Sequence, residues 1–135
     1  MELIADTSFL VGLWRKQSWA VGFAQSNRQR VLGIPWVVLG EFWHGALKAG
    51  HDAEIVRKFL LSGLPVYDVA PVVSVYAHIC CQAQESGFYA DIGQNDLWIA
   101  ATALSLRLPL VTRNRRHFYQ IEGLRLEVLA DDARK

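Results

Sequence analysis

The feature that most constrains the fold of this chain is a regular alternation between short apolar segments and longer segments with helical periodicity. The short segments are typical of buried strands. We predict strands at residues 2–5, 31–34, 65–69, 108–112 and 124–129. A chain that alternates strands and helices in this way buries a mostly parallel sheet between helices. We therefore expect an α/β protein, a three-layer α/β/α sandwich with a mostly parallel central sheet.

Helical patterns fill the intervals between these strands. We predict them at residues 7–14, 18–29, 35 onward, 55–60, 72–87 and 96–107, with a short helical turn at 114–118. Thr7 or Ser8 suits the N-cap of the first helix, and Asp96 suits the N-cap of the last long one. Because the segment from Asp96 to Arg107 carries charges only at its two ends, we expect that helix to be buried nearly all round.

Length and charge limit the kind of protein that the chain can be. With 135 residues, 52% of them hydrophobic, it is expected to form a single domain over residues 1–135 with a substantial core. The formal net charge is only +1, which excludes a bulk polycation. Any contact with nucleic acid must therefore come from a local basic patch.

The sequence also indicates a soluble, cytoplasmic protein. The longest apolar run, residues 31–40, is about half of what a membrane-spanning helix needs, and the N-terminus has no basic region typical of a signal peptide. Cys80 and Cys81 are adjacent within a helical pattern, where a disulfide between them would be strained. We expect both thiols to be reduced and no contact with a membrane.

Three acidic residues stand alone in apolar surroundings. Asp6, Glu41 and Asp96 are each the only carboxylate in their stretch of the chain. A carboxylate is costly to hold in such surroundings unless something positive shares the site. Asp6 and Asn114 each follow a strand, and the carboxyl ends of parallel strands meet at the switch point of the sheet. A shared cleft that holds a divalent metal ion is the simplest arrangement for these residues.

Such a site would suit hydrolysis of phosphodiester bonds. Mg²⁺ takes carboxylate oxygens and keeps several waters, and it can activate one of them for in-line attack. No protein nucleophile is then required, which agrees with the lack of a persuasive Ser-His-Asp or Cys-His arrangement. The amide oxygen of Asn114 could position the attacking water.

Four motifs appear in a fixed order along the chain. They are Ile-Ala-Asp-Thr-Ser at 4–8, Glu41 followed by Gly-Ala at 45–46, Asn-Asp-Leu-Trp-Ile-Ala-Ala at 95–101, and Leu-Val-Thr-Arg-Asn at 110–114 running into His117-Phe118. With these motifs the chain resembles a PIN-domain ribonuclease, specifically the VapC-type toxin of bacterial and archaeal toxin–antitoxin pairs. The resemblance covers essentially the whole chain.

The resemblance implies a function and a set of partners. Asp6, Glu41 and Asp96 would bind Mg²⁺ or Mn²⁺ and cut single-stranded segments of RNA, most plausibly tRNA, leaving a 5′-phosphate and a 3′-hydroxyl. It further implies a cognate antitoxin and a homodimer, with tryptophan-rich surface serving both. The chain departs from the family in the last motif, where members commonly carry Asp or Asn at the place of Asn114 and an acid just before the Phe, and this chain offers Asn114 and His117. One fewer negative charge in this loop should weaken a second metal site.

Hydroxyl and basic side chains complete the candidate site. Thr7, Ser8 and Thr112 could orient Asp6 or a bound water, or simply serve as cap and strand residues. A basic cluster beside the cleft could hold the RNA backbone, although charged loops are usually just solvated. This cluster consists of Arg113, Arg115 and Arg116.

Other readings remain open. A PIN-domain nuclease that processes RNA outside a toxin–antitoxin pair would carry the same motifs, and a non-catalytic α/β scaffold could use the acids only as helix caps. Glu41 and His44 have the Glu-x-x-His spacing of di-iron bundles, but those sites need the motif twice. No glycine-rich loop follows the first strand, which argues against a dinucleotide-binding protein.

Overall fold

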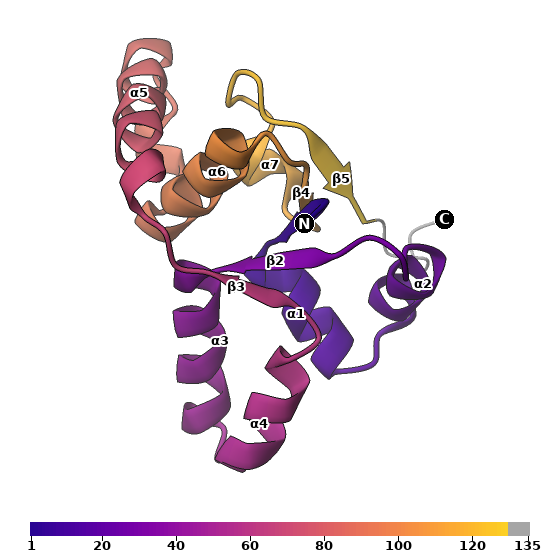
Figure 1. Cartoon of the computed structure of the whole chain (residues 1–135). Coiled ribbons are helices and arrows are strands. Elements are labelled where there is room, and N and C mark those ends of the chain that lie inside the picture. Colours follow the sequence, from indigo (N-terminus) through magenta and orange to yellow (C-terminus); the bar gives the residue numbers. More distant parts are fainter. Residues whose placement is uncertain (130–135) are drawn as a thin grey trace.

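A computed structural model describes residues 1–129, and these contain one five-stranded sheet (Figure 1). The strands are β1 (Leu3–Ala5), β2 (Leu32–Pro35), β3 (Leu64–Val66), β4 (Leu110–Thr112) and β5 (Leu126–Val128). Their order across the sheet is β3-β2-β1-β4-β5, and each neighbouring pair is parallel. The predicted parallel sheet is confirmed, and four of its five strands are shorter than expected. Residues 130–135, which the predicted single domain includes, lie outside the described part of the chain.

Helices cover both faces of this sheet. They are α1 (Thr7–Trp14), α2 (Ser18–Ser26), α3 (Trp36–Lys48), α4 (Ala53–Leu60), α5 (Ala70–Ser86), the 3₁₀ helix η1 (Tyr89–Asp91), α6 (Gln94–Leu106) and α7 (Arg115–Phe118). Figure 1 shows α1, α3 and α4 below the sheet and α5, α6 and α7 above it. The expected α/β/α sandwich is therefore confirmed. No helix within residues 1–129 combines the length and hydropathy that crossing a lipid bilayer requires.

The strand order places a switch point between β1 and β4. The chain moves outward from β1 through β2 to β3 and then returns to the other side of β1 to form β4. The crossovers therefore leave β1 and β4 in opposite directions, which opens a crevice at their carboxyl ends. The backbone N–H of Asp6 donates to the carbonyl of Val111 at 3.0 Å, so the ends of these two strands lie side by side.

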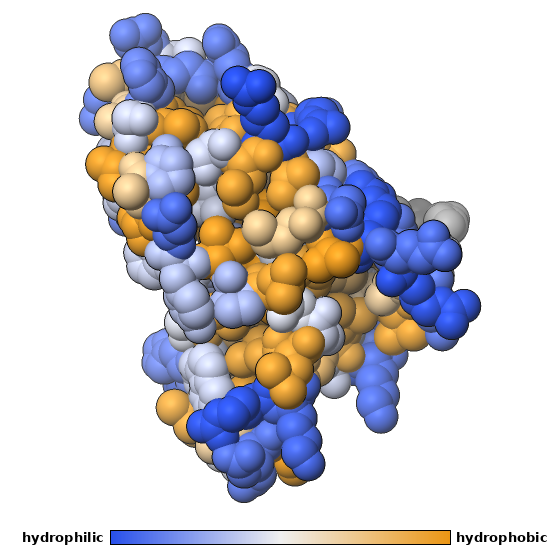
Figure 2. All heavy atoms as spheres, in the orientation of Figure 1, coloured by the Kyte–Doolittle hydropathy of each residue, from blue (hydrophilic) through white to orange (hydrophobic). Residues whose placement is uncertain are grey.

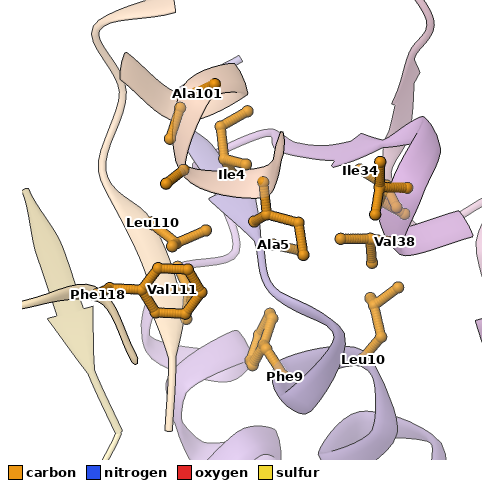
Figure 3. Packing of buried hydrophobic residues seen from close by; sticks show 14 of the residues in the cluster. Ile4, Ala5, Phe9, Leu10, Ile34, Val38, Ala101, Leu110, Val111 and Phe118 are labelled. Atoms are coloured by element: carbon orange, nitrogen blue, oxygen red, sulfur yellow. The ribbon is translucent and has the colours of Figure 1, made fainter. Parts of the chain in front are cut away.

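The core lies on the central strands. The side chains of Ile4 and Ala5 from β1 and of Leu110 and Val111 from β4 are completely buried (Figure 3). Helix α6 packs above them with a run of small residues, including Ala101, that lets the helix approach the sheet closely. Its middle is buried as expected, since every residue from 99 to 103 is buried. Burying a side chain as large as isoleucine contributes about 1.5–3 kcal/mol to the free energy of unfolding.

Two helix caps differ from the sequence-based prediction. Asp6, rather than Thr7 or Ser8, is the N-cap of α1, and its carboxylate accepts a hydrogen bond from the backbone N–H of Thr7 at 2.8 Å. Gly93, rather than Asp96, is the N-cap of α6. That helix begins earlier than expected, which places Asp96 in its first turn instead. The carboxylate of Asp96 therefore does not cap α6, and it contacts His117 instead.

Candidate active site

An open cleft of about 600 Å³ lies at the carboxyl ends of β1 and β4. Its lining includes all three predicted carboxylates, namely Asp6 after β1, Glu41 from α3 and Asp96 from α6. Asn114 and His117, which stand where the family has its last polar and acidic positions, also line it. Residues separated by up to about one hundred positions in sequence are thus brought to one place by the sheet order.

Asp6 is the most deeply buried of the three carboxylates, with only 3% of its surface exposed. Its Oδ2 accepts hydrogen bonds from the hydroxyls of Thr112 at 2.6 Å and Ser8 at 3.0 Å. Burial raises the pKa of Asp6, and these hydrogen bonds oppose the rise, while the nearby charge of Glu41 adds to it. These hydrogen bonds fix the orientation of the carboxylate, and its raised pKa shows that its negative charge is not fully compensated.

Glu41 is held through both of its oxygens. Its Oε1 accepts a hydrogen bond from the Thr7 hydroxyl at 2.5 Å, and its Oε2 accepts one from the Asn95 amide at 3.1 Å. Thr7 belongs to α1 and Asn95 to α6. The carboxylate of Glu41 consequently bridges helices from the two sides of the sheet and is fixed over the cleft.

Asp96 pairs with the residue that replaces a family acid. Its Oδ2 lies 2.8 Å from Nδ1 of His117 in α7. Burial raises the pKa of Asp96, the charges of Asp6 and Glu41 raise it further, and the contact with His117 opposes them. Since Asp96 lies in the first turn of α6, the helix dipole also favours its negative charge. The three carboxylates therefore interact electrostatically.

The predicted hydroxyl residues join the loop after β4 to Asp6. Thr112 donates to Asp6 and accepts a hydrogen bond from the backbone N–H of Asn114 at 2.9 Å. Ser8 likewise donates to Asp6 and accepts from the backbone N–H of Arg113 at 3.2 Å. Thr7 differs, because its hydroxyl reaches Glu41. All three hydroxyls thus orient carboxylates of the cleft, in addition to any role in local backbone structure.

The three arginines of the basic cluster lie in different places relative to the cleft. Within the described part of the chain, Arg113 lines the cleft, and its guanidinium lies 4.3 Å from the ring centroid of Trp19. Arg115 lies instead over the ring of Tyr119, 5.4 Å from its centroid. Neither Arg115 nor Arg116 belongs to the cleft lining. The short helix α7 turns these two side chains outward from the cleft.

Sequence reasoning missed several residues that the structure brings to the site, among them Gln17, Trp19 and Asn95. Gln17 and Trp19 line the cleft, and Asn95 binds Glu41. Asn95 could have been found, because it directly precedes Asp96 in a polar pair that opens an apolar helix. Nothing local marks Trp19 as a cleft residue, since its place depends on how α2 packs against α1.

The donor set fits a hard divalent cation in chemical type. Asp6, Glu41 and Asp96 supply carboxylate oxygens. Burial and, after it, the charge of neighbouring carboxylates raise the pKa of both aspartates, so a bound cation would stabilise their ionised forms. As the side chains stand, no three acidic, histidine or cysteine residues among residues 1–129 are gathered around one point as metal ligands. Each carboxylate is instead occupied by the hydrogen bonds described above.

Comparison with known proteins identifies the family. The PIN domain model matches residues 3–124, so the chain belongs to the PIN-domain family. PIN domains are nucleases, which hydrolyse phosphodiester bonds, and they generally use divalent metal ions. The resemblance inferred from the sequence motifs is therefore confirmed. No curated protein sequence matches the chain.

Solved structures similar to this chain come from VapBC complexes. One similar structure is VapBC2 from Rickettsia felis bound to a DNA fragment from its promoter. The matching chain is 25% identical to this one with a TM-score of 0.82, and the match covers 96% of this chain and 100% of that one. DNA-bound VapBC from Salmonella typhimurium gives 25% identity and a TM-score of 0.82, covering 95% and 98%. VapBC-1 from nontypeable Haemophilus influenzae gives 25% identity and a TM-score of 0.78, and the match covers 95% of this chain and 98% of that one. The likeness to VapC-type PIN-domain proteins thus extends over nearly the whole chain.

Proposed function

We propose that this protein is the toxin of a toxin–antitoxin pair and acts as a metal-dependent endoribonuclease on RNA, with tRNA as its substrate. The observation that carries the proposal is the meeting of Asp6, Glu41 and Asp96 in one open cleft at the switch point of a PIN fold. Cleavage would take place in the cytoplasm and would halt translation until the antitoxin blocks the cleft.

The chain's own residues have separable roles in this reaction. Asp6, Glu41 and Asp96 would hold Mg²⁺ or Mn²⁺. The chemistry that such an ion supplies when bound is activation of water and neutralisation of the charge that develops on the phosphate. Ser8 and Thr112 fix Asp6 through hydrogen bonds.

The remaining contacts orient the other carboxylates and the substrate. Thr7 and Asn95 fix Glu41, and His117 holds Asp96. Asn114 lines the cleft, where its amide can orient a water or a phosphate oxygen. Addition of water across the P–O3′ bond gives a 5′-phosphate and a 3′-hydroxyl, with the proton of the water passing to the departing oxygen.

An antitoxin partner is supported by the relatives, which are described as VapBC complexes. A homodimer is supported by apolar surface along β3, visible as orange atoms in Figure 2. Leu61, Leu64 and Tyr67 in and around this strand are 78%, 51% and 67% exposed. Exposed apolar residues grouped at a sheet edge are typical of an interface. Light scattering coupled to size exclusion should give twice the chain mass at micromolar concentration, and a strict monomer would contradict the dimer.

The nuclease is tested by incubating a total tRNA pool with protein free of copurified antitoxin. Reactions contain Mg²⁺, Mn²⁺ or EDTA, and Asp96→Asn is run beside the wild type. We expect discrete fragments that require metal and disappear in the variant. Equal cleavage by both proteins would indicate a contaminating nuclease. No cleavage, together with no metal-induced shift in melting temperature, would favour the non-catalytic scaffold.

A further inference from the structure

Within residues 1–129, both the backbone and the side chain of Arg113 make contacts beside the cleft. Its backbone N–H donates to the Ser8 hydroxyl, which itself donates to Asp6, so the loop after β4 is anchored to the floor of the site. Its guanidinium lies over the indole of Trp19 at 4.3 Å from the ring centroid. A cation at this distance from an indole face is attracted by the ring electrons.

Trp19 in turn packs closely against Gly12 of α1. A Cβ atom at position 12 would lie 2.3 Å from Cη2 and 2.6 Å from Cζ2 of the indole, so the ring rests directly on the backbone of α1. Gly12 is buried, whereas Trp19 is only half-buried. The indole therefore lies against the backbone of α1 and in contact with the guanidinium of Arg113, and these two side chains form a stack at the edge of the cleft.

The location of this stack gives it a chemical role. Trp19 and Arg113 line the same cleft as the three carboxylates. The chain has a formal net charge of only +1, so affinity for an RNA backbone must come from cations placed where the strand passes. A guanidinium carries five N–H donors and can bind a phosphate through two of them while its plane remains stacked. Nucleobases also stack on guanidinium planes when RNA is single-stranded.

We propose that Trp19 is a positioning residue that holds Arg113 as a preformed clamp for single-stranded RNA, with the guanidinium binding the phosphate next to the bond that is cut. Preorganisation is the reason for the stack, because a side chain that is already ordered loses less conformational entropy on binding. The role assigned to both residues rests on the nuclease activity proposed above.

The test separates binding from catalysis. The kcat and KM for cleavage of a short single-stranded RNA are measured in Mn²⁺, and the Kd for the same fluorescein-labelled RNA is measured by anisotropy in EDTA. Variants are Arg113→Ala, Arg113→Lys, Trp19→Leu, Trp19→Phe and the double variant Trp19→Leu/Arg113→Ala. The control is Arg57→Ala, because Arg57 makes the same kind of contact over Trp43, at 5.8 Å, and does not line the cleft.

Loss of a charge-assisted phosphate contact should raise the Kd and KM of Arg113→Ala about tenfold with little change in kcat. The slope of log K against log salt should become shallower by roughly 0.7. Trp19→Leu should raise KM severalfold, Trp19→Phe should largely restore it, and Trp19→Leu should add nothing once Arg113 is alanine. Such non-additivity is the sign that Trp19 acts through Arg113. Arg57→Ala should behave as wild type.

Several results would overturn the clamp. Melting curves first identify the variants that remain folded. If folded Arg113→Ala and Arg113→Lys keep the wild-type KM and Kd, Arg113 does not bind RNA, even though metal-dependent cleavage by the wild type would leave the nuclease intact. If Trp19→Leu and Arg113→Ala have additive effects, Trp19 does not act through Arg113. If the wild type neither binds nor cuts RNA, the nuclease and the clamp both fail.

Discussion

At the scale of single residues, the carboxylates of the cleft oppose the stability of the fold that holds them. Asp6 and Asp96 both have raised pKa values, caused first by burial and then increased by neighbouring negative charge. His117 contacts Asp96, and hydroxyls contact Asp6, but these contacts only offset the cost in part. A site built to receive a cation is expected to show this imbalance when no cation is bound.

Asp96→Asn should stabilise the protein in EDTA. The substitution removes one negative charge next to Asp6 and Glu41 while keeping nearly the same shape, and we expect the melting temperature to rise by roughly 2–4 °C. Saturation with Mn²⁺ at about 100 times its Kd should add about 2.7 kcal/mol to the wild type and much less to the variant. Asp91→Asn, an exposed acid outside the cleft lining, is the control and should leave both curves unchanged. Equal shifts in both variants would argue against a metal site.

The raised pKa values also give the direction of the pH dependence. Because the folded state binds protons at Asp6 and Asp96 more tightly than the unfolded chain does, the free energy of unfolding in EDTA should fall as pH rises from the ordinary value of 3.8 through the raised values. At pH values above both raised pKa values, the contribution of Asp6 and Asp96 to the free energy of unfolding should no longer change with pH. Urea titrations at a series of pH values measure the free energy of unfolding. Asp6→Asn should make its dependence on pH less steep. A slope identical to that of the wild type would contradict the burial cost assigned to Asp6.

His117→Asp should restore an acid at the position where family members commonly carry one. The new carboxylate would face Asp96 in place of the imidazole that now lies 2.8 Å away. We expect a lower melting temperature in EDTA, because repulsion increases, and Mn²⁺ binding that is tighter by roughly tenfold. Isothermal titration calorimetry gives the affinity, with His78→Asp on the exposed side of α5 as the control. An unchanged affinity would show that position 117 does not face the metal.

At the scale of the elements, local sequence signals placed the helices well and their first residues less well. Gly87 ends α5 with φ of 84°, as its position after the amphipathic pattern indicated. The starts of α1 and α6 were shifted because Asp6 and Gly93 adopt the extended N-cap conformation. Several neighbouring polar residues could cap each helix, and only packing of the helix on the sheet selects one of them.

Gly87→Ala and Gly22→Ala should have opposite effects on stability. At Gly87 the positive φ penalises a Cβ atom, so we expect a loss of about 1 kcal/mol. Gly22 lies inside α2, and a Cβ there meets no described atom within 4 Å, so alanine should add about 0.5–1 kcal/mol. Urea denaturation measures both. A destabilised Gly22→Ala variant would show that its surface is packed against a partner in solution.

At the scale of the whole molecule, the order of the strands creates the site. Asp6 and Thr112 are 106 residues apart, yet their side chains are hydrogen-bonded because β1 and β4 are neighbours. Glu41 and Asp96 come from helices in opposite layers, and Asn95 joins them across the end of the sheet. Disturbance of either layer is therefore expected to affect the cleft.

The chain should unfold as one domain. Tryptophans report from both layers, since Trp14 and Trp43 lie in α1 and α3 and Trp98 lies in α6. Far-UV circular dichroism reports on all helices together. We expect the two signals to give coincident urea midpoints, as in a two-state transition. Separate midpoints would show that the layers unfold independently, and the predicted single domain would then be wrong.

The sequence by itself determined the α/β class, the parallel sheet and the three carboxylates that line the cleft. Strand and helix periods are local properties, and Asp6, Glu41 and Asp96 stand out because each is alone among apolar neighbours. The tertiary structure decided which side chains touch. It paired His117 with Asp96, joined Asn95 to Glu41, and placed Trp19 beneath Arg113. These contacts depend on strand order and on the packing of distant helices, and no local pattern encodes either one.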